Sequence, residues 1–287
     1  MSTVDEISAN PVALSPQGFA RFARFITQEL GIKMPEAKVP MLQSRLMRRL
    51  RKLQLGSLDE YQEYLFNSPE AKEELVHFID AVTTNKTDFF REPQHFGYLV
   101  GSALPELSRI HGGSNWRLKL WCAGCSSGEE PYTLAMVLSE YAAQHAGFDF
   151  SILATDISTK VLDHARTGIY DQARVEPVPL PLRRKYLLRS SNPARSLIRL
   201  VPELRSRVSF HRLNFMDADY GLREKFDVIF FRNVMIYFDK ETQEAVIQKQ
   251  CRNLRAGGYL FVGHSESLAG LDIPVSLVNS AVFRKPL

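Results

Sequence analysis

The stretch WCAGCSSGEEPY, residues 121–132, brings together side chains that could do chemistry in several ways. Two cysteines, two serines, two glycines and two glutamates follow one another where a predicted strand ends and a predicted helix begins. Such a loop could cradle a phosphate, bind a metal, run a redox couple or hold a cationic cofactor. The rest of the chain has to decide between these four uses.

The two glutamates argue against a phosphate ligand. Gly124 and Gly128 let the backbone approach a ligand closely, but their spacing is GxxxG, not the GxGxxG of dinucleotide-binding loops. Glu129 and Glu130 occupy the first helical turn, where a pyrophosphate would need bare N–H groups. Two carboxylates would repel a pyrophosphate and suit the ammonium group of an amino-acid cofactor. Acids at this position also interact favourably with the helix dipole, and this plain structural role stays open, more so for Glu129.

The two cysteines of the loop form a CxxC pair. A structural zinc site usually needs four Cys or His ligands, and the only other cysteine is Cys251. A redox pair favours a helix start that stabilises thiolates, whereas here Cys122 and Cys125 precede two glutamates. We therefore expect small residues that line a pocket, with no metal. Three cysteines, an odd number, indicate free thiols in a reduced, cytoplasmic protein.

Polar residues also end three later strand-like runs. Asp156, in ATDIS, stands where an acid binds ribose hydroxyls in nucleoside-binding α/β folds, although it could also cap the next helix. Asn214, in RLNF, could meet an adenine edge. Asn233, in FFRNVMIYF, could serve the reaction centre or simply make a turn. Ribose binding without pyrophosphate binding points to S-adenosylmethionine as the cofactor.

The elements that would position these residues fall into two parts. Residues 1–83 contain apolar residues at intervals of three and four, which predicts a small all-helical domain. Residues 84–287 alternate strand-like runs with helices, which predicts a doubly wound, Rossmann-like α/β sheet. The last two runs lie too close for a helical crossover, so we expect the last strand to be antiparallel. Residues 177–205 contain four prolines by residue 193 and predict an inserted subdomain.

Composition and charge limit the function classes. The 287 residues are 45% hydrophobic and 24% charged, and no apolar run approaches the roughly 18 residues of a membrane span. The first residues, MSTVDEISAN, carry acids where a secretory signal would be basic, so we expect no membrane insertion. The net charge is only +4, but residues 45–52 hold five cations and residues 181–207 hold eight against Glu203 alone. Two basic surfaces indicate an acidic partner, either protein or nucleic acid.

With these residues in place, the chain resembles the CheR-type chemotaxis receptor methyltransferases. The resemblance covers nearly the whole chain and rests on five motifs: TTNKTDFFRE (83–92), GCSSGEEPYTLAM (124–136), ATDIS (154–158), FFRNVMIYFD (230–239) and GGYLFVGHSESL (257–268). It implies transfer of a methyl group from S-adenosylmethionine to glutamates of bacterial chemoreceptors. The products would be S-adenosylhomocysteine and the glutamyl methyl esters of chemotaxis adaptation.

The resemblance also assigns roles to individual residues. Glu130 would hold the methionine ammonium group, Asp156 the ribose, and Asn214 with Phe215 the adenine. The full set of cofactor-binding residues would be Asn85, Thr87, Arg91, Glu130, Asp156, Asn214, Phe215, Asn233 and Val234. Arg91 and Tyr237 would act in catalysis beside the transferring methyl group.

Two further surfaces are implied as partner sites. Arg45, Arg48, Arg49 and Lys52 fall on one face of a predicted helix, which would match the family's helix that faces the receptor methylation helices. A solvated basic face is the plain alternative. The 177–205 insertion would be a small β subdomain that, in some family members, binds a peptide at the receptor's C-terminus. Those members carry glycines in the matching loop and SSNPARS (190–196) has none, so this second partner stays open.

The implied mechanism needs no general base. A receptor glutamate titrates near pH ~4.3 and is already ionised at neutral pH. Arg91 would orient this carboxylate, and Tyr237 would pack or hydrogen-bond beside the methyl group. His264, in GHSE, is expected to be a packed or capping histidine.

Three other functions compete with this interpretation. A nucleic-acid methyltransferase would use the basic surfaces for phosphates, but residues 232–235 lack the prolines of the (Asp/Asn)-Pro-Pro-aromatic motif of base methyltransferases. A cofactor-binding regulator without catalysis is disfavoured by intact Arg91 and Tyr237. An NAD-dependent dehydrogenase is disfavoured by the acids of the loop.

Overall fold

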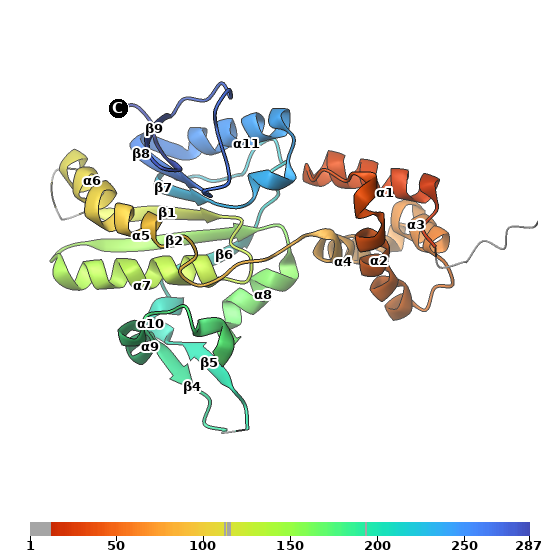
Figure 1. Cartoon of the computed structure of the whole chain (residues 1–287), viewed down its shortest axis with the longest axis horizontal. Helices are drawn as coiled ribbons and strands as arrows, with labels where there is room; N and C mark the ends of the chain where they lie inside the picture. Colours follow the sequence, from red (N-terminus) through yellow and green to blue (C-terminus); the bar gives the residue numbers. More distant parts are fainter. Residues whose placement is uncertain (1–12, 112, 114–115, 193) are drawn as a thin grey trace, which may run out of the picture. The chain divides into compact units, whose positions relative to one another are not determined.

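A computed structural model describes residues 13–111, 113, 116–192 and 194–287 (Figure 1). The first twelve residues, on which the expectation about a secretory signal rests, lie outside this range. The described chain divides into two compact units that join between Thr84 and Asn85, and each unit is described by itself.

The N-terminal unit is helical, as predicted. Its elements are α1 (Pro16–Leu30), η1 (Glu36–Lys38), α2 (Val39–Leu53), α3 (Leu58–Asn67), η2 (Pro69–Ala71) and α4 (Lys72–Val82). Ser57 caps α3 by accepting a hydrogen bond from the Glu60 N–H (3.1 Å), and Gly31 ends α1 with φ +69°. Helix α2 ends at Gln54, which adopts the left-handed conformation (φ +58°).

The C-terminal unit is built on one mixed sheet of seven strands. Their order is β6 (Val208–Arg212), β2 (Asp149–Asp156), β1 (Arg117–Ala123), β7 (Phe226–Phe231), β8 (Leu254–Val262), β10 (Val282–Arg284) and β9 (Ser276–Asn279). The first five are parallel, whereas β10 runs antiparallel to both neighbours, with Val282 opposite Phe261 in β8. The predicted doubly wound sheet with an antiparallel end is therefore confirmed.

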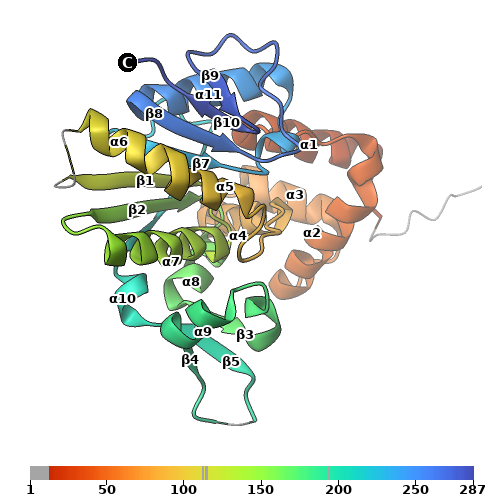
Figure 2. The same ribbon diagram turned by 60° about the vertical axis from the view of Figure 1, so that its left-hand side comes forward.

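Helices cover the sheet and bury its apolar strands. They are α5 (Gln94–Tyr98), η3 (Leu99–Ala103), α6 (Leu104–Ile110), α7 (Glu129–Gln144), α8 (Thr159–Thr167), α10 (Pro202–Arg205), η5 (Met235–Tyr237) and α11 (Lys240–Asn253). Figure 2 shows α5, α6 and α7 lying along the sheet. Phe96 of α5 stacks on Phe230 of β7, with ring centroids 6.1 Å apart. Every residue of β7 is buried, as in a strand that is covered on both faces of the sheet.

The inserted subdomain is a separate antiparallel sheet. It consists of β3 (Ile169–Asp171), η4 (Gln172–Val175), α9 (Leu180–Tyr186), β4 (Leu187–Arg189) and β5 (Leu197–Leu200), with β5 in the middle. A small β subdomain is therefore present, but it begins at Ile169 and not at residue 177. Gly168 ends α8 with φ +60° and turns the chain directly into β3, which is too short to show a strand period.

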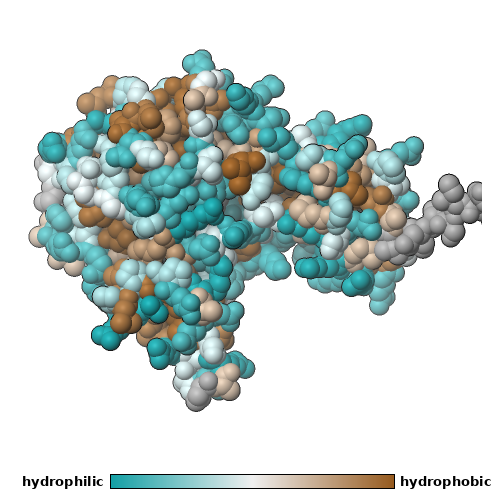
Figure 3. Space-filling view, viewed as in Figure 1, coloured by the Kyte–Doolittle hydropathy of each residue, from teal (hydrophilic) through white to brown (hydrophobic). Residues whose placement is uncertain are grey.

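Within the described residues, no helix combines the length and the apolarity needed to cross a lipid bilayer. The face of the molecule seen in Figure 3 is largely hydrophilic, with apolar residues scattered among the polar ones. Single apolar residues on a surface are normal and carry no functional meaning by themselves.

Candidate functional site

The predicted cofactor residues gather at the carboxyl edge of the sheet. The glycine-containing loop follows β1, Asp156 ends β2, Asn214 and Phe215 follow β6, and Asn233 follows β7. The segment before α5, residues 85–92, is hydrogen-bonded to the same edge, as described below. The carboxyl ends of parallel strands form the ligand-binding crevice of open α/β sheets, so this is the place for a cofactor.

Gly124 shows how closely three of these loops approach one another. A Cβ atom at Gly124 would lie 2.6 Å from Cγ2 of Val234 and 3.9 Å from Cε2 of Phe215. Its φ of +80° also favours glycine. The predicted residues after β6 and β7 therefore lie directly beside the loop after β1.

Asp156 is buried and holds the loop in place. One carboxylate oxygen accepts the N–H of Ser126 (2.8 Å) and the other accepts the N–H of Ser158 (3.0 Å). The Ser126 hydroxyl in turn donates to the carbonyl of Asn85 (2.9 Å). The expectation that Asp156 could itself cap α8 is wrong, because the Ser158 hydroxyl is the cap.

Glu129 has a structural role. Its side chain is 1% exposed, forms an ion pair with Arg174 of the inserted subdomain and accepts the Ser127 hydroxyl (2.7 Å). Arg174 also donates to the carbonyl of Thr87 (2.7 Å). Glu129 therefore joins the inserted subdomain, the loop after β1 and residues 85–92.

Glu130 belongs to a different ion-pair network. Arg232, 2% exposed, donates from Nη1 to Glu130 Oε1 (3.0 Å) and from Nη2 to Glu92 Oε2 (2.9 Å). Burial raises the pKa of Glu130 above its ordinary value, although the charge of Arg232 opposes the rise. Burial also acts to raise the pKa of Glu92, but Arg232 outweighs it, and this pKa lies below its ordinary value. Sequence reasoning missed Arg232, whose signal was a single cation directly after a buried strand.

The backbone on both sides of Arg91 adopts an uncommon conformation. Phe90 and Glu92 both have a φ of +54°, which is costly for side chains other than glycine. The Phe90 N–H donates to the Thr133 hydroxyl (3.2 Å), and the Arg91 carbonyl accepts from Arg232 Nη2 (2.6 Å). Since the surrounding elements hold this turn, the half-buried Arg91 side chain is presented from a fixed backbone.

Glu266 holds the turn that carries Asn233. Its carboxylate accepts the backbone N–H groups of Asn233 (2.8 Å), Met235 (2.8 Å) and Gly263 (2.7 Å). Asn233 has a φ of +59°, and a Cβ atom at Gly263 would lie 2.4 Å from its amide nitrogen. Burial raises the pKa of Glu266, which these N–H donors oppose. Sequence reasoning also missed Glu266, an acid in GHSES just after a buried strand.

Tyr237 and Val234 complete the predicted set. Both are half-buried and lie on the turn after β7, Val234 just before η5 and Tyr237 at its end. The structure thus brings the predicted residues of the C-terminal unit to one edge of the sheet. Their contacts with a cofactor remain predictions.

Glu92, His95 and His264 lie close enough to suggest a metal, with potential ligand atoms all within 4.8 Å of one another. Burial lowers the pKa of His95 to about 4, so its ring is neutral at physiological pH. However, the two imidazole rings stack, with centroids 4.5 Å apart and planes 24° apart, so their in-plane lone pairs do not converge on one point. Glu92 is already hydrogen-bonded to Arg232, and we assign no metal to this group.

The cysteines of the loop are buried free thiols. Burial raises the pKa of both Cys122 and Cys125 well above the usual value, so both stay protonated. Thiolates are what redox exchange and zinc binding require. Both side chains pack in the hydrophobic core of the C-terminal unit, and their lining of a pocket stays a prediction.

Two cations of the predicted basic face of α2 are engaged within the N-terminal unit. Arg49 forms a two-pronged ion pair with the buried Glu74 (2.9 and 2.5 Å), which also accepts the Tyr61 hydroxyl (2.7 Å). Arg45 donates to the carbonyl of Val82 (2.7 Å) and to other groups at the end of α4.

The other two predicted cations of α2, Arg48 and Lys52, are exposed, as is the neighbouring Arg51. The predicted basic face therefore contains two kinds of residue. Arg45 and Arg49 bind α2 to the rest of its unit, whereas the charged groups of Arg48 and Lys52 are exposed to solvent.

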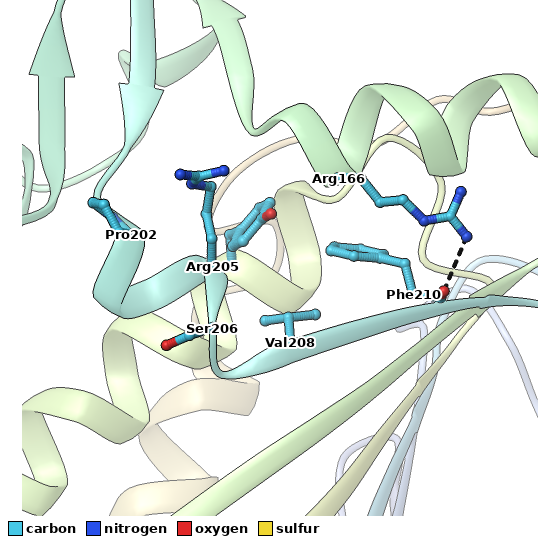
Figure 4. A pocket seen from close by; sticks show the side chains of 7 residues that line it. Arg166, Pro202, Arg205, Ser206, Val208 and Phe210 are labelled. Atoms are coloured by element: carbon cyan, nitrogen blue, oxygen red, sulfur yellow. Dashed lines mark hydrogen bonds between the residues drawn. The ribbon is translucent and has the colours of Figure 1, made fainter.

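A hollow of about 370 Å³ lies elsewhere in the C-terminal unit, at the β6 edge of the sheet (Figure 4). Its lining residues are Tyr132, Arg166, Pro202, Arg205, Ser206, Val208 and Phe210. The Arg166 guanidinium donates hydrogen bonds to the Phe210 carbonyl (3.0 Å), as drawn in Figure 4, and to the Asp163 carboxylate. None of the predicted cofactor residues lines this hollow, and we assign no ligand to it.

Comparison with known proteins gives matches over both units. The family model for the CheR methyltransferase SAM-binding domain matches residues 85–283, and the model for the CheR methyltransferase all-alpha domain matches residues 17–83. Chemotaxis protein methyltransferase 2 of Pseudomonas aeruginosa is 41% identical over 255 residues, or 88% of this chain and 87% of that protein. The chemotaxis protein methyltransferases of Borreliella burgdorferi (38% over 261 residues; 90% and 91%) and Salmonella typhimurium (37% over 274 residues; 95% and 91%) are similar as well.

Proposed function

This chain belongs to the CheR methyltransferase family, and from that premise we propose that it methylates glutamate side chains of bacterial chemoreceptors. The family match makes it an S-adenosylmethionine-dependent methyltransferase of chemotaxis. The proposal adds the acceptor group, a receptor carboxylate that becomes a methyl ester. The family match supports the receptor as acceptor, and the acidic network of Glu92 and Glu130 around Arg232 supports a cationic cofactor at this edge of the sheet.

The proposed cofactor contacts follow the loops of that edge. Glu130 receives the methionine ammonium group, since its carboxylate is buried and only partly neutralised by Arg232. Asp156 receives the ribose hydroxyls, because its buried carboxylate is the last residue of β2, at the carboxyl edge of the sheet. Asn214 and Phe215 frame the adenine.

The remaining predicted contacts surround the reacting end of the cofactor. Asn233 and Val234 line its methionine part, from the turn that Glu266 fixes. Asn85 and Thr87 lie on the segment whose carbonyls are held by Ser126 and Arg174. We assign these two to contacts beside the methyl group.

The chemistry is a displacement at the methyl carbon. A carboxylate oxygen of the receptor forms the new O–C bond while the S–C bond breaks, and the sulfonium becomes the neutral thioether of S-adenosylhomocysteine. The acceptor is ionised at neutral pH, so the protein has to position it and exclude water. Arg91 orients the carboxylate and Tyr237 packs beside the methyl group. Arg91 must not bind the anion too strongly, because that charge is lost in the transition state.

The N-terminal unit is proposed to recognise the receptor. Arg48 and Lys52 offer exposed positive charge to acidic methylation helices, and Arg45 and Arg49 hold α2 in the orientation that presents them. We place this reaction in the cytoplasm, where three buried free thiols stay reduced. Loop 190–196 lacks the glycines of peptide-binding relatives, so no receptor tether is proposed there.

One experiment separates this function from its rival. The protein is incubated with methyl-labelled S-adenosylmethionine and, in separate reactions, with chemoreceptor cytoplasmic fragments, RNA or DNA. We expect label on the receptor alone, released by mild base as an ester requires. Label on nucleic acid, base-stable label on the receptor, or no label in any reaction would contradict the proposal.

A further inference from the structure

Arg232 connects two parts of the site that act at different moments. Through Nη1 it contacts Glu130 (3.0 Å), the proposed partner of the cofactor ammonium group. Through Nη2 it contacts the carbonyl of Arg91 (2.6 Å) and the carboxylate of Glu92 (2.9 Å), both on the turn that presents Arg91. One planar guanidinium therefore spans the cofactor side and the acceptor side of the site.

The charges of this network do not balance. Two carboxylates, Glu92 and Glu130, share one guanidinium, so the three side chains carry a net charge of −1. The side chain of Glu92 is 17% exposed, that of Glu130 is 11% exposed and that of Arg232 is 2% exposed. Water can therefore compensate little of the net negative charge. The charge of Arg91 also favours the Glu130 carboxylate, but it acts on its pKa less than burial, Arg232 and Glu92 do. A ligand that brings a further positive charge would therefore stabilise this network.

The turn that carries Arg91 depends on the same network. Phe90 and Glu92 hold a φ of +54° on either side of Arg91, a conformation that persists only when neighbouring groups enforce it. On the acceptor side, that enforcement comes from Arg232 through two hydrogen bonds. A change in the charge balance at Glu130 is therefore felt at the backbone of Arg91.

We propose that Arg232 is a positioning residue that couples cofactor occupancy to the placement of Arg91. When the cofactor ammonium group neutralises Glu130, the guanidinium is drawn less to Glu130 and holds the Arg91 turn more firmly. The acceptor carboxylate is then oriented only when a methyl donor is present. This inference rests on the proposed role of Arg91 and does not depend on the identity of the methyl acceptor.

The test uses Arg232→Lys in the full chain. A lysine keeps the positive charge beside Glu130 but lacks the planar fork that reaches the Arg91 carbonyl at the same time. Arg255→Lys is the matched control, because Arg255 also pairs with a buried carboxylate, Asp227 (2.7 Å), at the opposite end of β7. Calorimetry measures the affinity for S-adenosylhomocysteine. Hydrogen exchange measures how strongly that ligand protects the amides of residues 85–92.

In the wild type and in Arg255→Lys, S-adenosylhomocysteine is expected to slow exchange of these amides about tenfold. In Arg232→Lys that protection is lost while affinity stays within about threefold. Unchanged protection in Arg232→Lys, parallel loss of affinity and protection, or no protection in the wild type would overturn the coupling. A wild type that shows the expected protection but methylates no receptor would refute the proposed acceptor and leave the coupling intact.

A second variant covers the case in which Arg232→Lys does not fold. Glu92→Gln keeps an oxygen that accepts from Arg232 but removes the excess negative charge of the network. It is expected to bind S-adenosylhomocysteine about tenfold more weakly than the wild type, with a similar unfolding temperature. Unchanged affinity in this variant would overturn the charge argument.

Discussion

Glu129 and Glu130 are adjacent in sequence and have different partners in space. Glu129 is neutralised by Arg174, and Glu130 is only partly neutralised by Arg232. We predict that Glu130→Gln weakens binding of S-adenosylhomocysteine at least about tenfold, because the ammonium group loses its counter-charge. Glu129→Gln should instead lower the unfolding temperature and leave affinity within about threefold. Calorimetry and thermal unfolding of both variants check this, and a stable Glu129→Gln that binds as weakly as Glu130→Gln would contradict it.

The raised pKa of Glu130 also gives a pH dependence with a definite sign. Burial favours the protonated form in the free protein, whereas the cofactor ammonium group favours the carboxylate. The cofactor must therefore displace a proton at low pH, and affinity should fall as the pH decreases. The loss should begin above pH ~4.3, where an ordinary glutamate titrates. Calorimetry across a pH series measures it; Glu130→Gln should show a flatter profile, and an affinity that rises on acidification would refute the assignment.

For single residues, the sequence predicted which residue types belong to the site better than it predicted which side chains they contact. The loop acids, Asp156 and Asn233 stood out because each lies at the end of a buried strand or just after it. Arg232 and Glu266 were missed because their function lies in hydrogen bonds to distant segments: Arg232 contacts Glu130, which lies 102 positions earlier, and Glu266 contacts Asn233, 33 positions earlier. No local period or spacing records such a contact.

Helix α2 is the element whose prediction changed most. Its periodicity predicted one basic face. In the structure, Arg49 forms an ion pair with the buried Glu74, whereas Arg48 is exposed to solvent. We predict that Arg49→Ala destabilises the N-terminal unit by about 3 kcal/mol, because it leaves a buried carboxylate without its cation. Arg48→Ala should change the unfolding free energy by no more than about 0.5 kcal/mol. Denaturant unfolding measures both, and equal effects would contradict the division of this face.

Arg48 is expected to contribute to receptor recognition, whereas Arg49 contributes to stability. Arg48→Glu should reduce receptor methylation through a higher receptor KM, with binding of S-adenosylhomocysteine unchanged, since the charge of α2 meets the receptor and not the cofactor. Steady-state kinetics with varied receptor concentration provides the measurement. A fall in kcat alone, at constant receptor KM, would speak against α2 as the receptor-facing helix.

Strand and helix patterns predicted the elements well where the period was long enough to count. The parallel strands and the helices of the N-terminal unit have such patterns, and the antiparallel end was predicted from the short spacing of the last two runs. The start of the inserted sheet was missed because β3 has three residues, Ile169–Asp171, and follows a helix without a linker.

The whole molecule has no need to deprotonate its acceptor, because the receptor carboxylate arrives already ionised. Turnover on the receptor should therefore stay constant between about pH 6 and 8, because a glutamate near ~4.3 does not change charge there. His95 fits this expectation, since its pKa of about 4 keeps it neutral over the same range. A pH–rate profile that falls tenfold per pH unit below pH ~7 would show that a general base takes part.

The measurement closest to the central claim is the site of the transferred methyl group. Receptor fragments methylated by this protein are digested and mapped by mass spectrometry before and after treatment with mild base. We predict added methyl groups on glutamate side chains, lost in base as methanol, and no modification of a receptor fragment whose methylated glutamates are replaced by aspartate or alanine. A base-stable methyl group on a lysine, arginine or other nitrogen, or a methylated nucleic acid in place of the receptor, would contradict the account.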